Sequence, residues 1–432
     1  MSTMAIGFIG LGIMLVLLFL GTSLSFTFAL SGLIGIIMLL GFDKASASLM
    51  STPFTQATTY SYIVMPLFML MGDIAFDGKL TEDAYTVAKK WLGHLPGGLA
   101  VTSTVASAIF GAVCGSGSTT AMVMSRVSWP EMKKAGYKPS FGLGAIAAAG
   151  PIGILIPPST PLIIYGILSN TSVAALFMAG WLPGLLLTLA ICVTTVIMAL
   201  IYPKRAPRSD KTTMKEKLRS MVNVIPFAIL IIVVMGGIWL GICTVNEGAA
   251  IGVCGALIIV IAMRRMKGKK LLETLKNVCG NGSSLFYMFV GMAFFQTFMT
   301  LSGLPKALAN WVGGLNVGPY VIIWCIVLLY LFLGCFLDSP PVMLLTTAIL
   351  AEVVSSLGFS LVWFGIVVTF TCAIGALSPP VGINLFVIRN TVPDVSINEI
   401  IKGVIPYICV IFAVLIVIMY VPQISLLLPS LM

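Results

Sequence analysis

Two apolar regions of this sequence are interrupted in the same way, about 220 residues apart. In the first, glycine, serine and threonine fill residues 111–120, and a Gly/Pro-rich break follows at 150–159. In the second, an aspartate and two prolines lie within 334–341, and a similar break follows at 375–384. Lipid cannot satisfy free N–H and C=O groups, so backbone at membrane depth is unwound only where it is buried in protein or lines a cavity. The matched breaks therefore predict a ligand-binding cavity between membrane-spanning helices.

The composition places most of the chain in a lipid bilayer. Hydrophobic residues make up 59% of the sequence and charged residues 9%, with a mean hydropathy of +1.10, whereas soluble domains carry about 25% charged residues. We therefore predict an all-α polytopic membrane protein. The net charge of +10 comes from short Lys/Arg clusters between apolar spans, which are typical of cytoplasmic loops. No basic domain lies outside the membrane, so no nucleic-acid partner is expected.

Cysteine and histidine usage argues against disulfides and transition-metal chemistry. The nine cysteines lie singly in or near apolar spans without a CxxC pair, and His94 is the only histidine. We expect free thiols that pack as small apolar groups, no transition-metal site and no covalently bound cofactor. No Lys or Arg precedes Lys44. The basic start of a signal peptide is missing, and the first span is expected to be retained.

The basic clusters predict the topology. A span needs about 20 residues, and apolar stretches lie at 5–20, 25–43, 56–77, 98–126, 139–170, 176–202, 221–241, 245–263, 277–302, 319–358, 360–391 and 403–422. The basic loops at 204–219 and 264–276 are both expected in the cytoplasm. The clusters at 79–90 and 131–138 also lie in the cytoplasm if 98–126 is a re-entrant hairpin, so charge favours the hairpin. Both termini are then expected in the periplasm.

The two halves of the chain carry the same pattern of residues. Matching pairs at offsets of 220 to 223 residues include Gly21 with Gly241, Gly32 with Gly252, Trp91 with Trp311, Ser116 with Asp338, and Gly180 with Gly403. The basic flanks at 79–90 and 131–138 have counterparts near 300–312 and 353–360 that contain only Lys306. The two halves are therefore expected to cross the membrane in opposite directions, as an inverted-topology repeat.

The repeat also predicts the domain boundaries. In chain order we expect a first repeat at 1–203 with an interfacial arm, a hairpin at 98–126 and a broken helix at 139–170, a basic cytoplasmic linker at 204–220, and a second repeat at 221–432 with a hairpin within 319–358 and a broken helix at 360–391.

Polar side chains at the breaks are candidates for binding a small cation. The tip at 114–120 offers hydroxyl groups beside glycines, and hard cations such as Na⁺ prefer oxygen ligands. A close helix contact lined by small residues is the structural alternative. Asp338 is costly inside an apolar span and is therefore a functional candidate, unless it lies at a span end near water. The prolines within 378–384 have no N–H group to donate, so backbone carbonyl groups there are left free to face an ion. The N-termini of half-helices at these breaks can attract an anion.

Other acidic residues are expected to have simpler roles. Asp43, Asp73 and Asp77 lie near predicted span ends and are expected at the membrane interface. Glu247 follows Thr244 by three residues, a spacing that predicts a helix start.

The ordered motifs resemble those of the large membrane subunit of TRAP transporters. They cover nearly the whole chain, at 66–72, 97–100, 115–116, 130–132, 136–137, 156–159, 176–184, 337–338 and 379–386. The resemblance implies a non-enzymatic, sodium-driven importer of organic acid anions, such as C4-dicarboxylates or sugar acids, in the bacterial inner membrane. It also implies an elevator mechanism, in which a transport domain moves against a scaffold. The implied partners are a small four-helix membrane subunit and a periplasmic substrate-binding protein.

The resemblance assigns residues to sodium and substrate sites. One Na⁺ would bind between the first hairpin and first break, another between the second hairpin and second break, and substrate between them. The residues implied at the sodium sites are Ser116, Gly117, Ser118, Gly153, Pro157, Ser159, Asp338, Ser378, Pro379, Gly382 and Asn384. Those implied at the substrate are Ser116, Thr119, Ser159, Asp338 and Asn384. The family's hairpin tip usually reads Ser-Gly-Ser-Ser, so Cys114 here removes one hydroxyl group.

Three other functions account for parts of the pattern. A stand-alone sodium-coupled anion symporter or exchanger would need neither partner. An intramembrane enzyme would use Asp73 with Asp338, or a serine of the first hairpin tip, but no second group completes either site. A channel is disfavoured because inverted repeats with broken helices suit alternating access.

Overall fold

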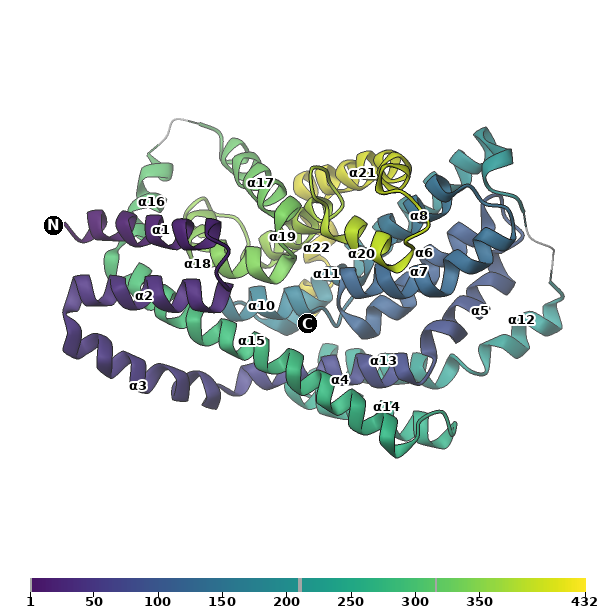
Figure 1. Ribbon diagram of the computed structural model, residues 1–432, viewed down its shortest axis with the longest axis horizontal. Helices are drawn as coiled ribbons and strands as arrows, with labels where there is room; N and C mark the ends of the chain where they lie inside the picture. Colours follow the sequence, from purple (N-terminus) through teal and green to yellow (C-terminus); the bar gives the residue numbers. More distant parts are fainter. Residues whose placement is uncertain (1, 209–211, 315–316) are drawn as a thin grey trace.

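The computed structural model describes residues 2–208, 212–314 and 317–432, and over these residues the chain consists of helices and their connections (Figure 1). Part of the expected basic linker, residues 209–211 with Lys211, lies outside the described residues. Among the described helices, six are long and apolar enough to cross a membrane, or up to nine if each bent pair counts as one span. The prediction of an all-α polytopic membrane protein is confirmed.

The helices of the two halves follow one another in the same order. The first half contains α1 (Thr3–Phe19), α2 (Leu24–Leu40), α3 (Phe42–Thr58), α4 (Val64–Asp77), α5 (Leu80–Leu92), α6 (Gly98–Cys114), α7 (Gly117–Lys134), α8 (Pro139–Ala149), α9 (Ile152–Leu155), α10 (Thr160–Leu168) and α11 (Val173–Ile201). After α12 (Met214–Met221), the second half contains α13 (Ile225–Trp239), α14 (Val245–Ala262), α15 (Gly268–Ser302), α16 (Leu304–Gly313), α17 (Pro319–Phe336), α18 (Ser339–Ser356), α19 (Leu361–Gly375), α20 (Ile383–Thr391), α21 (Ile397–Tyr420) and α22 (Gln423–Leu426). The domain boundaries themselves stay a prediction.

One long helix of the second half is divided in the first. The single 35-residue helix α15 occupies the place that α3 and α4 share in the first half. The first half has Pro66 in the first turn of α4, and its chain bends by 56° between α3 and α4. Proline lacks a backbone N–H and its ring clashes with the carbonyl group four residues earlier, so it is tolerated in the first turn of a helix but disrupts its interior, and α15 contains no proline. The sequence therefore breaks one long helix in the first half and keeps it continuous in the second.

Local sequence signals set several helix ends. Thr244 and Glu247 form the expected capping box at the start of α14, where each side chain accepts a hydrogen bond from the backbone N–H of the other residue. The role predicted for Glu247 is thus confirmed. Gly115 ends α6 with a φ of +64°, a conformation that glycine adopts without the steric cost of a side chain.

The helices pack in two groups. In the first, α2 lies along α15, α4 packs against α14 and α15, and α1 and α13 flank them (Figure 1). A β-carbon at Gly32 would stand 2.5 Å from the backbone of Phe294, so α2 and α15 approach as closely as small residues permit. The second group contains the α6–α7 and α17–α18 hairpins, the broken helices, α11 and α21.

Both expected hairpins are present. Helices α6 and α7 are antiparallel neighbours joined at residues 115–116, and the return helix runs on to Lys134, beyond the expected end at 126. Lys89 before the hairpin pairs with Glu131 near its end, with 2.6 Å between Nζ and Oε2. The two flanks of the hairpin therefore lie on the same face of the protein, as the charge argument required. The second hairpin turns at Leu337 and Asp338, between α17 and α18.

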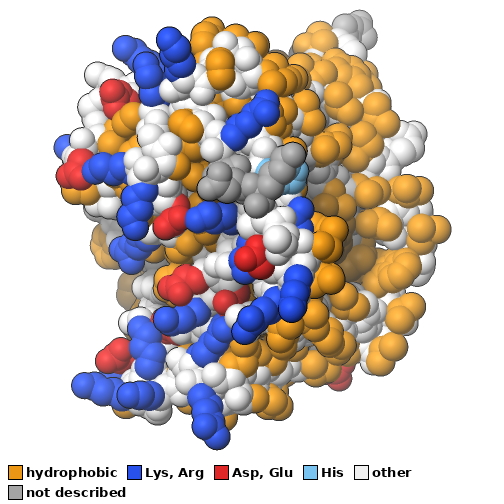
Figure 2. Space-filling view, turned by 90° about the vertical axis from the view of Figure 1, so that its right-hand side faces the viewer, with side chains coloured by type: hydrophobic (Ala, Val, Ile, Leu, Met, Phe, Trp, Pro, Cys, Tyr) orange, Lys and Arg blue, Asp and Glu red, His pale blue; other side chains and the backbone are white. Residues whose placement is uncertain are grey.

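The basic clusters gather on one face of the protein. Figure 2 shows this face, on which Lys and Arg side chains gather beside hydrophobic side chains. Arg265 pairs with Asp83, and Lys133 of the first half lies 3.4 Å from Asp394 of the second. The residue of the first half that corresponds to Asp394 lies just after α10. Lys133 lies before α8, at the other end of the same broken helix. Contact between Lys133 and Asp394 therefore agrees with two halves that run in opposite directions.

Candidate functional site

The tip of the first hairpin meets residues of the second half. The Ser118 hydroxyl lies 2.9 Å from Asn384 Oδ1 and 3.3 Å from Asp338 Oδ2. Its single proton can be donated to one of these oxygens at a time. Asp338 also accepts a 2.8 Å hydrogen bond from the Ser339 backbone N–H through its other carboxylate oxygen, which caps α18. Three polar side chains from both repeats thus form one cluster.

The first break lies against the first hairpin. A β-carbon at Gly111 of α6 would stand 2.5 Å from the Gly153 Cα of α9, so only glycine permits this approach. After α9, residues 156–159 are unwound and buried, and the Thr160 N–H donates to the Gly115 carbonyl at 3.2 Å. The fully buried Ser159 donates to the Ile154 carbonyl and caps α10. The break and the hairpin tip are therefore one connected unit.

The second break repeats this contact. A β-carbon at Gly375 of α19 would stand 2.7 Å from the Gly334 Cα of α17. The Gly382 N–H donates to the Cys335 carbonyl at 3.1 Å, and Gly382 has a φ of +66°. Ser378 is held by a 2.8 Å hydrogen bond to the Ile374 carbonyl. Pro379 is exposed, whereas its counterpart Pro157 in the first break is buried. The two breaks therefore share their packing but differ in their access to the surroundings.

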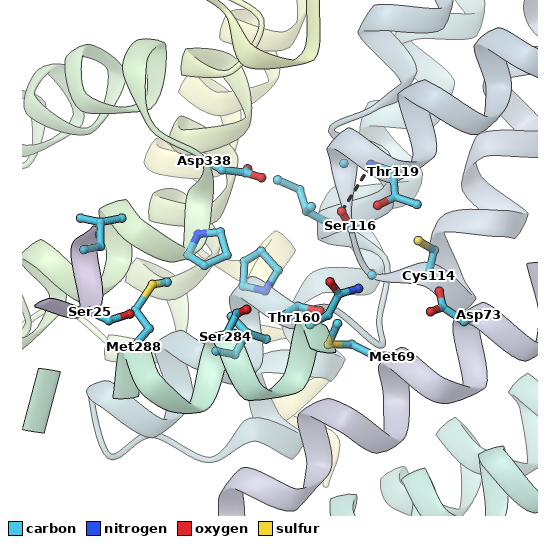
Figure 3. Close-up of a pocket in the computed structure, with 18 residues that line it drawn as sticks. Ser25, Met69, Asp73, Cys114, Ser116, Thr119, Thr160, Ser284, Met288 and Asp338 are labelled. Atoms are coloured by element: carbon cyan, nitrogen blue, oxygen red, sulfur yellow. Dashed lines mark hydrogen bonds between the residues drawn. The ribbon is translucent and has the colours of Figure 1, made fainter. Parts of the chain in front are cut away.

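A cavity of about 500 Å³ lies between the first helix group and the hairpin tips. Figure 3 shows Ser116, Thr119 and Asp338 on the hairpin side, with Ser25, Ser284 and Met288 on the opposite side. Of the residues that the resemblance implies, Ser116, Gly117, Thr119 and Asp338 line the cavity. The others lie outside its lining, namely Ser118, Gly153, Pro157, Ser159, Ser378, Pro379, Gly382 and Asn384. Ser118 and Asn384 reach it indirectly, through the hydrogen bonds that join them to each other and to Asp338.

Sequence reasoning missed the opposite wall of the cavity. Asp73 of α4 lines it beside Cys114 (Figure 3), a place in the cavity that the expected interfacial role did not include. The sequence feature that could have indicated a cavity position for Asp73 is its place directly after the apolar run 62–72. Asn281 and Ser284 of α15 also face the cavity. Nothing in the sequence around them distinguishes these residues from other polar positions of that helix.

The electrostatics of the cavity favour cations near its carboxylates. Among the described residues that line it, Asp73 and Asp338 are acidic and none is Lys, Arg or His. Helices α7 and α18 both begin at the hairpin tips, capped by Ser116 and Asp338. Helix N-termini carry partial positive charge and can hold an anion. The arrangement can therefore bind a small cation through oxygen ligands and an anionic group beside it.

Comparisons with known proteins give a consistent result. Residues 11–424 match the family described as the DctM component of the tripartite ATP-independent periplasmic transporters. The C4-dicarboxylate TRAP transporter large permease protein DctM of Pseudomonas aeruginosa is 30% identical over 405 residues, which cover 92% of this chain and 93% of that protein. The sialic acid TRAP transporter large permease protein SiaM of Vibrio cholerae is 32% identical over 378 residues, covering 86% and 87%. The Alcanivorax borkumensis YdaH transporter has a similar fold, with a TM-score of 0.63 at 15% identity over 91% of this chain and 89% of that chain.

Proposed function

The chain belongs to the DctM family of large permease subunits of TRAP transporters, and from this premise we propose that it imports organic acid anions driven by a sodium gradient. The observation that carries the proposal is the cluster of Ser118, Asp338 and Asn384, which joins the hairpin tips of both halves beside the cavity. A carboxylate, an amide and hydroxyl groups are oxygen donors of the kind that a hard monovalent cation prefers.

Two sodium sites are proposed, one in each half. In the first, the hairpin tip at Ser116 and Gly117 faces the break through the Thr160–Gly115 hydrogen bond. In the second, Asp338 and Asn384 meet at the Ser118 hydroxyl. A bound Na⁺ at each would neutralise charge next to the cavity and allow an anionic substrate to enter it. Import of the anion is then coupled to the sodium gradient, because the substrate and the cations bind more tightly together than alone.

The proposed substrates are carboxylates such as C4-dicarboxylates or sugar acids. The relatives from Pseudomonas aeruginosa and Vibrio cholerae are named for a C4-dicarboxylate and for sialic acid, which are both organic acids. A cavity of about 500 Å³ has room for molecules of either size. Ser116 and Thr119 offer hydroxyl groups, and the N-termini of α7 and α18 offer partial positive charge.

We propose an elevator mechanism because the cavity lies between two groups of helices. Met69 and Asp73 of α4, with Ser284 and Met288 of α15, line one side, and the hairpin tips line the other. Each hairpin packs on its own broken helix through a glycine pair, so hairpin and break can move as one body. The group around α2, α4, α14 and α15 would then be the scaffold.

The proposed partners are a small four-helix membrane subunit and a periplasmic substrate-binding protein. The family name describes a tripartite transporter. The alternative is a stand-alone symporter that needs neither partner. Liposomes that contain this chain alone, this chain with the small subunit, or both with the binding protein distinguish these possibilities. We expect uptake only in the third set, and equal uptake by the chain alone would contradict the proposal.

The basic face is proposed to lie in the cytoplasm of the bacterial cell, with both termini in the periplasm. Cysteines introduced at Lys138 and Lys269 should react with a membrane-impermeant maleimide only from the cytoplasmic side, because basic flanks remain there. A cysteine at Lys306 should react only from the periplasmic side. Peptide mass spectrometry reads each position separately from the native thiols. Labelling of Lys138→Cys and Lys306→Cys from the same side would contradict the inverted repeat.

Ser116→Ala is expected to reduce the initial rate of uptake by about tenfold or more. The change removes a hydroxyl group that lines the cavity and accepts a hydrogen bond from the Thr119 N–H at 3.4 Å, and loss of an N-cap alone costs about 1 kcal/mol. Uptake is measured in liposomes with equal amounts of incorporated protein. Ser107→Ala is the matched control, because Ser107 lies in the same hairpin, buried and away from the cavity. A native rate in Ser116→Ala would remove this residue from the site.

A further inference from the structure

Asp73 is a carboxylate that the proposed sodium sites do not use. It lies in α4, partly buried, and lines the cavity beside Cys114 (Figure 3). Within the three described ranges of the chain, no hydrogen bond or ion pair involves its side chain. Asp77, one turn later, is paired with Lys270 at 3.2 Å and accepts a hydrogen bond from Thr274 at 2.6 Å. A partly buried carboxylate without a partner costs free energy unless a cation or donor reaches it.

The end of α6 provides unpaired carbonyl groups at the same place. The Gly115 N–H donates to the Gly111 carbonyl at 3.0 Å, and the chain then turns away from the helix. No donor among the described residues bonds to the carbonyls of Ala112, Val113 or Cys114. Ala112 and Val113 are only 5% and 3% exposed. Buried carbonyl groups need a partner, and the C-terminus of a helix attracts cations.

Close packing brings Asp73 to these carbonyls. A β-carbon at Gly72 would stand 2.8 Å from the Val113 carbonyl oxygen and 3.2 Å from the Cys114 Cα. Helix α4 therefore touches the end of α6 at the residue immediately before Asp73. A side chain at residue 72 would separate the two helices.

The second half lacks the carboxylate, and one of its corresponding carbonyl groups is bonded. Ala293 stands 220 residues after Asp73, so the corresponding position of α15 has no charge. The Cys335 carbonyl, which corresponds to that of Val113, accepts a hydrogen bond from the Gly382 N–H. In the first half the equivalent donor, the Thr160 N–H, bonds to Gly115 instead and leaves Val113 free. Among these matched positions of the described residues, a carboxylate and a free carbonyl equivalent to that of Val113 thus occur together in the first half and not in the second.

We propose that Asp73 and the free carbonyls at the end of α6 bind a further sodium ion, between α4 and the first hairpin tip. Oxygen ligands suit this cation, and a single carboxylate balances one positive charge, whereas divalent sites commonly gather several carboxylates. The ion joins the proposed scaffold to the moving hairpin and would be released when the two separate. It therefore stabilises the conformation described here. In this respect the inference rests on the proposed function.

The reactivity of Cys114 reports on this site. The full-length chain, in lipid nanodiscs, is treated with methyl methanethiosulfonate in sodium chloride or in choline chloride of the same ionic strength, and modification of Cys114 is followed by peptide mass spectrometry. We expect Na⁺ to slow the modification of Cys114 in the native chain. In Asp73→Asn the half-protecting Na⁺ concentration should rise by about tenfold or more, because the only charged ligand is lost. Asp73→Glu should retain most of the protection.

The controls separate this inference from a general loss of structure. Asp43→Asn removes an exposed acid at the start of α3 and should leave the protection unchanged. The exposed Cys279 and Cys409 are measured in the same samples and should react equally in every variant. Equal sodium protection in Asp73→Asn and the native chain would overturn the proposal, as would no sodium effect on Cys114 in the native chain. Sodium-driven uptake by the native complex is measured in parallel. If uptake depends on sodium but Cys114 shows no sodium protection, the further site is contradicted and the proposed function is not.

Discussion

Replacement of Asp338 with asparagine should reduce sodium-driven uptake by about a hundredfold or more, which corresponds to about 2.7 kcal/mol. Asp338 supplies the charge of the cluster that joins the two halves, where it accepts hydrogen bonds from Ser118 and from the Ser339 N–H. Asparagine has a similar shape and can still cap α18, but it cannot balance a cation. The initial rate of uptake in liposomes, with both partners present, measures the effect.

The control for Asp338 is a carboxylate outside the cavity. Asp394 is exposed on the basic face and pairs with Lys133, and exposed ion pairs contribute about 0 to 1 kcal/mol. Asp394→Asn should therefore transport at nearly the native rate. A native rate in Asp338→Asn would show that the cation site lies elsewhere, and a severe loss in both variants would indicate a general effect of charge.

Gly111→Ala is expected to lower both the melting temperature and the rate of uptake. The new β-carbon would stand 2.5 Å from the Gly153 Cα, so the backbones of the hairpin and the broken helix must separate. Overpacking of this kind costs about 1 to 3 kcal/mol. Gly375→Ala should have a similar effect, because its β-carbon would stand 2.7 Å from the Gly334 Cα. Thermal unfolding in detergent and uptake in liposomes measure the two effects.

The matched control is another helical glycine with free space around it. A β-carbon at Gly236 of α13 would have no neighbour within 4 Å, and alanine is favoured over glycine in a helix by about 1 kcal/mol. Gly236→Ala should therefore melt at or above the native temperature. If Gly111→Ala melts as high as Gly236→Ala, the glycine contact does not hold the hairpin to the break.

The sequence predicted the local architecture because its signals are local. Glycine and proline mark the tips and breaks through their own backbone preferences, and both hairpins and both broken helices lie where these residues occur. The positions of Lys and Arg added that the first hairpin returns to the same face, which the Lys89–Glu131 pair supports.

Contacts between distant segments could not be predicted in this way. The resemblance implied one cation site in each half, whereas the Ser118 hydroxyl of the first half reaches Asp338 and Asn384 of the second. Asp73 was expected at the interface because it follows an apolar run, but the approach of Gly72 to Val113 brings it to the cavity. Both outcomes depend on how helices far apart in the sequence pack.

The two Pro-Pro breaks also differ for tertiary reasons. Gly180 of α11 packs on the Leu155 carbonyl and covers the first break, where Pro157 is buried. Its counterpart Gly403 of α21 packs instead on the Ser140 carbonyl of α8, in the other half. Pro379 in the second break remains exposed. The same local sequence therefore has different surroundings in the two halves.

The most direct test of the account is uptake under imposed ion gradients. Liposomes that contain the chain and its small subunit are given the binding protein and a radiolabelled carboxylate that calorimetry shows it to bind. An inward sodium gradient should drive accumulation above the external concentration. Choline or potassium in place of sodium should abolish that accumulation, because in the proposed mechanism the anion and Na⁺ at the hairpin tips bind best together. Accumulation that persists unchanged without a sodium gradient would contradict the account.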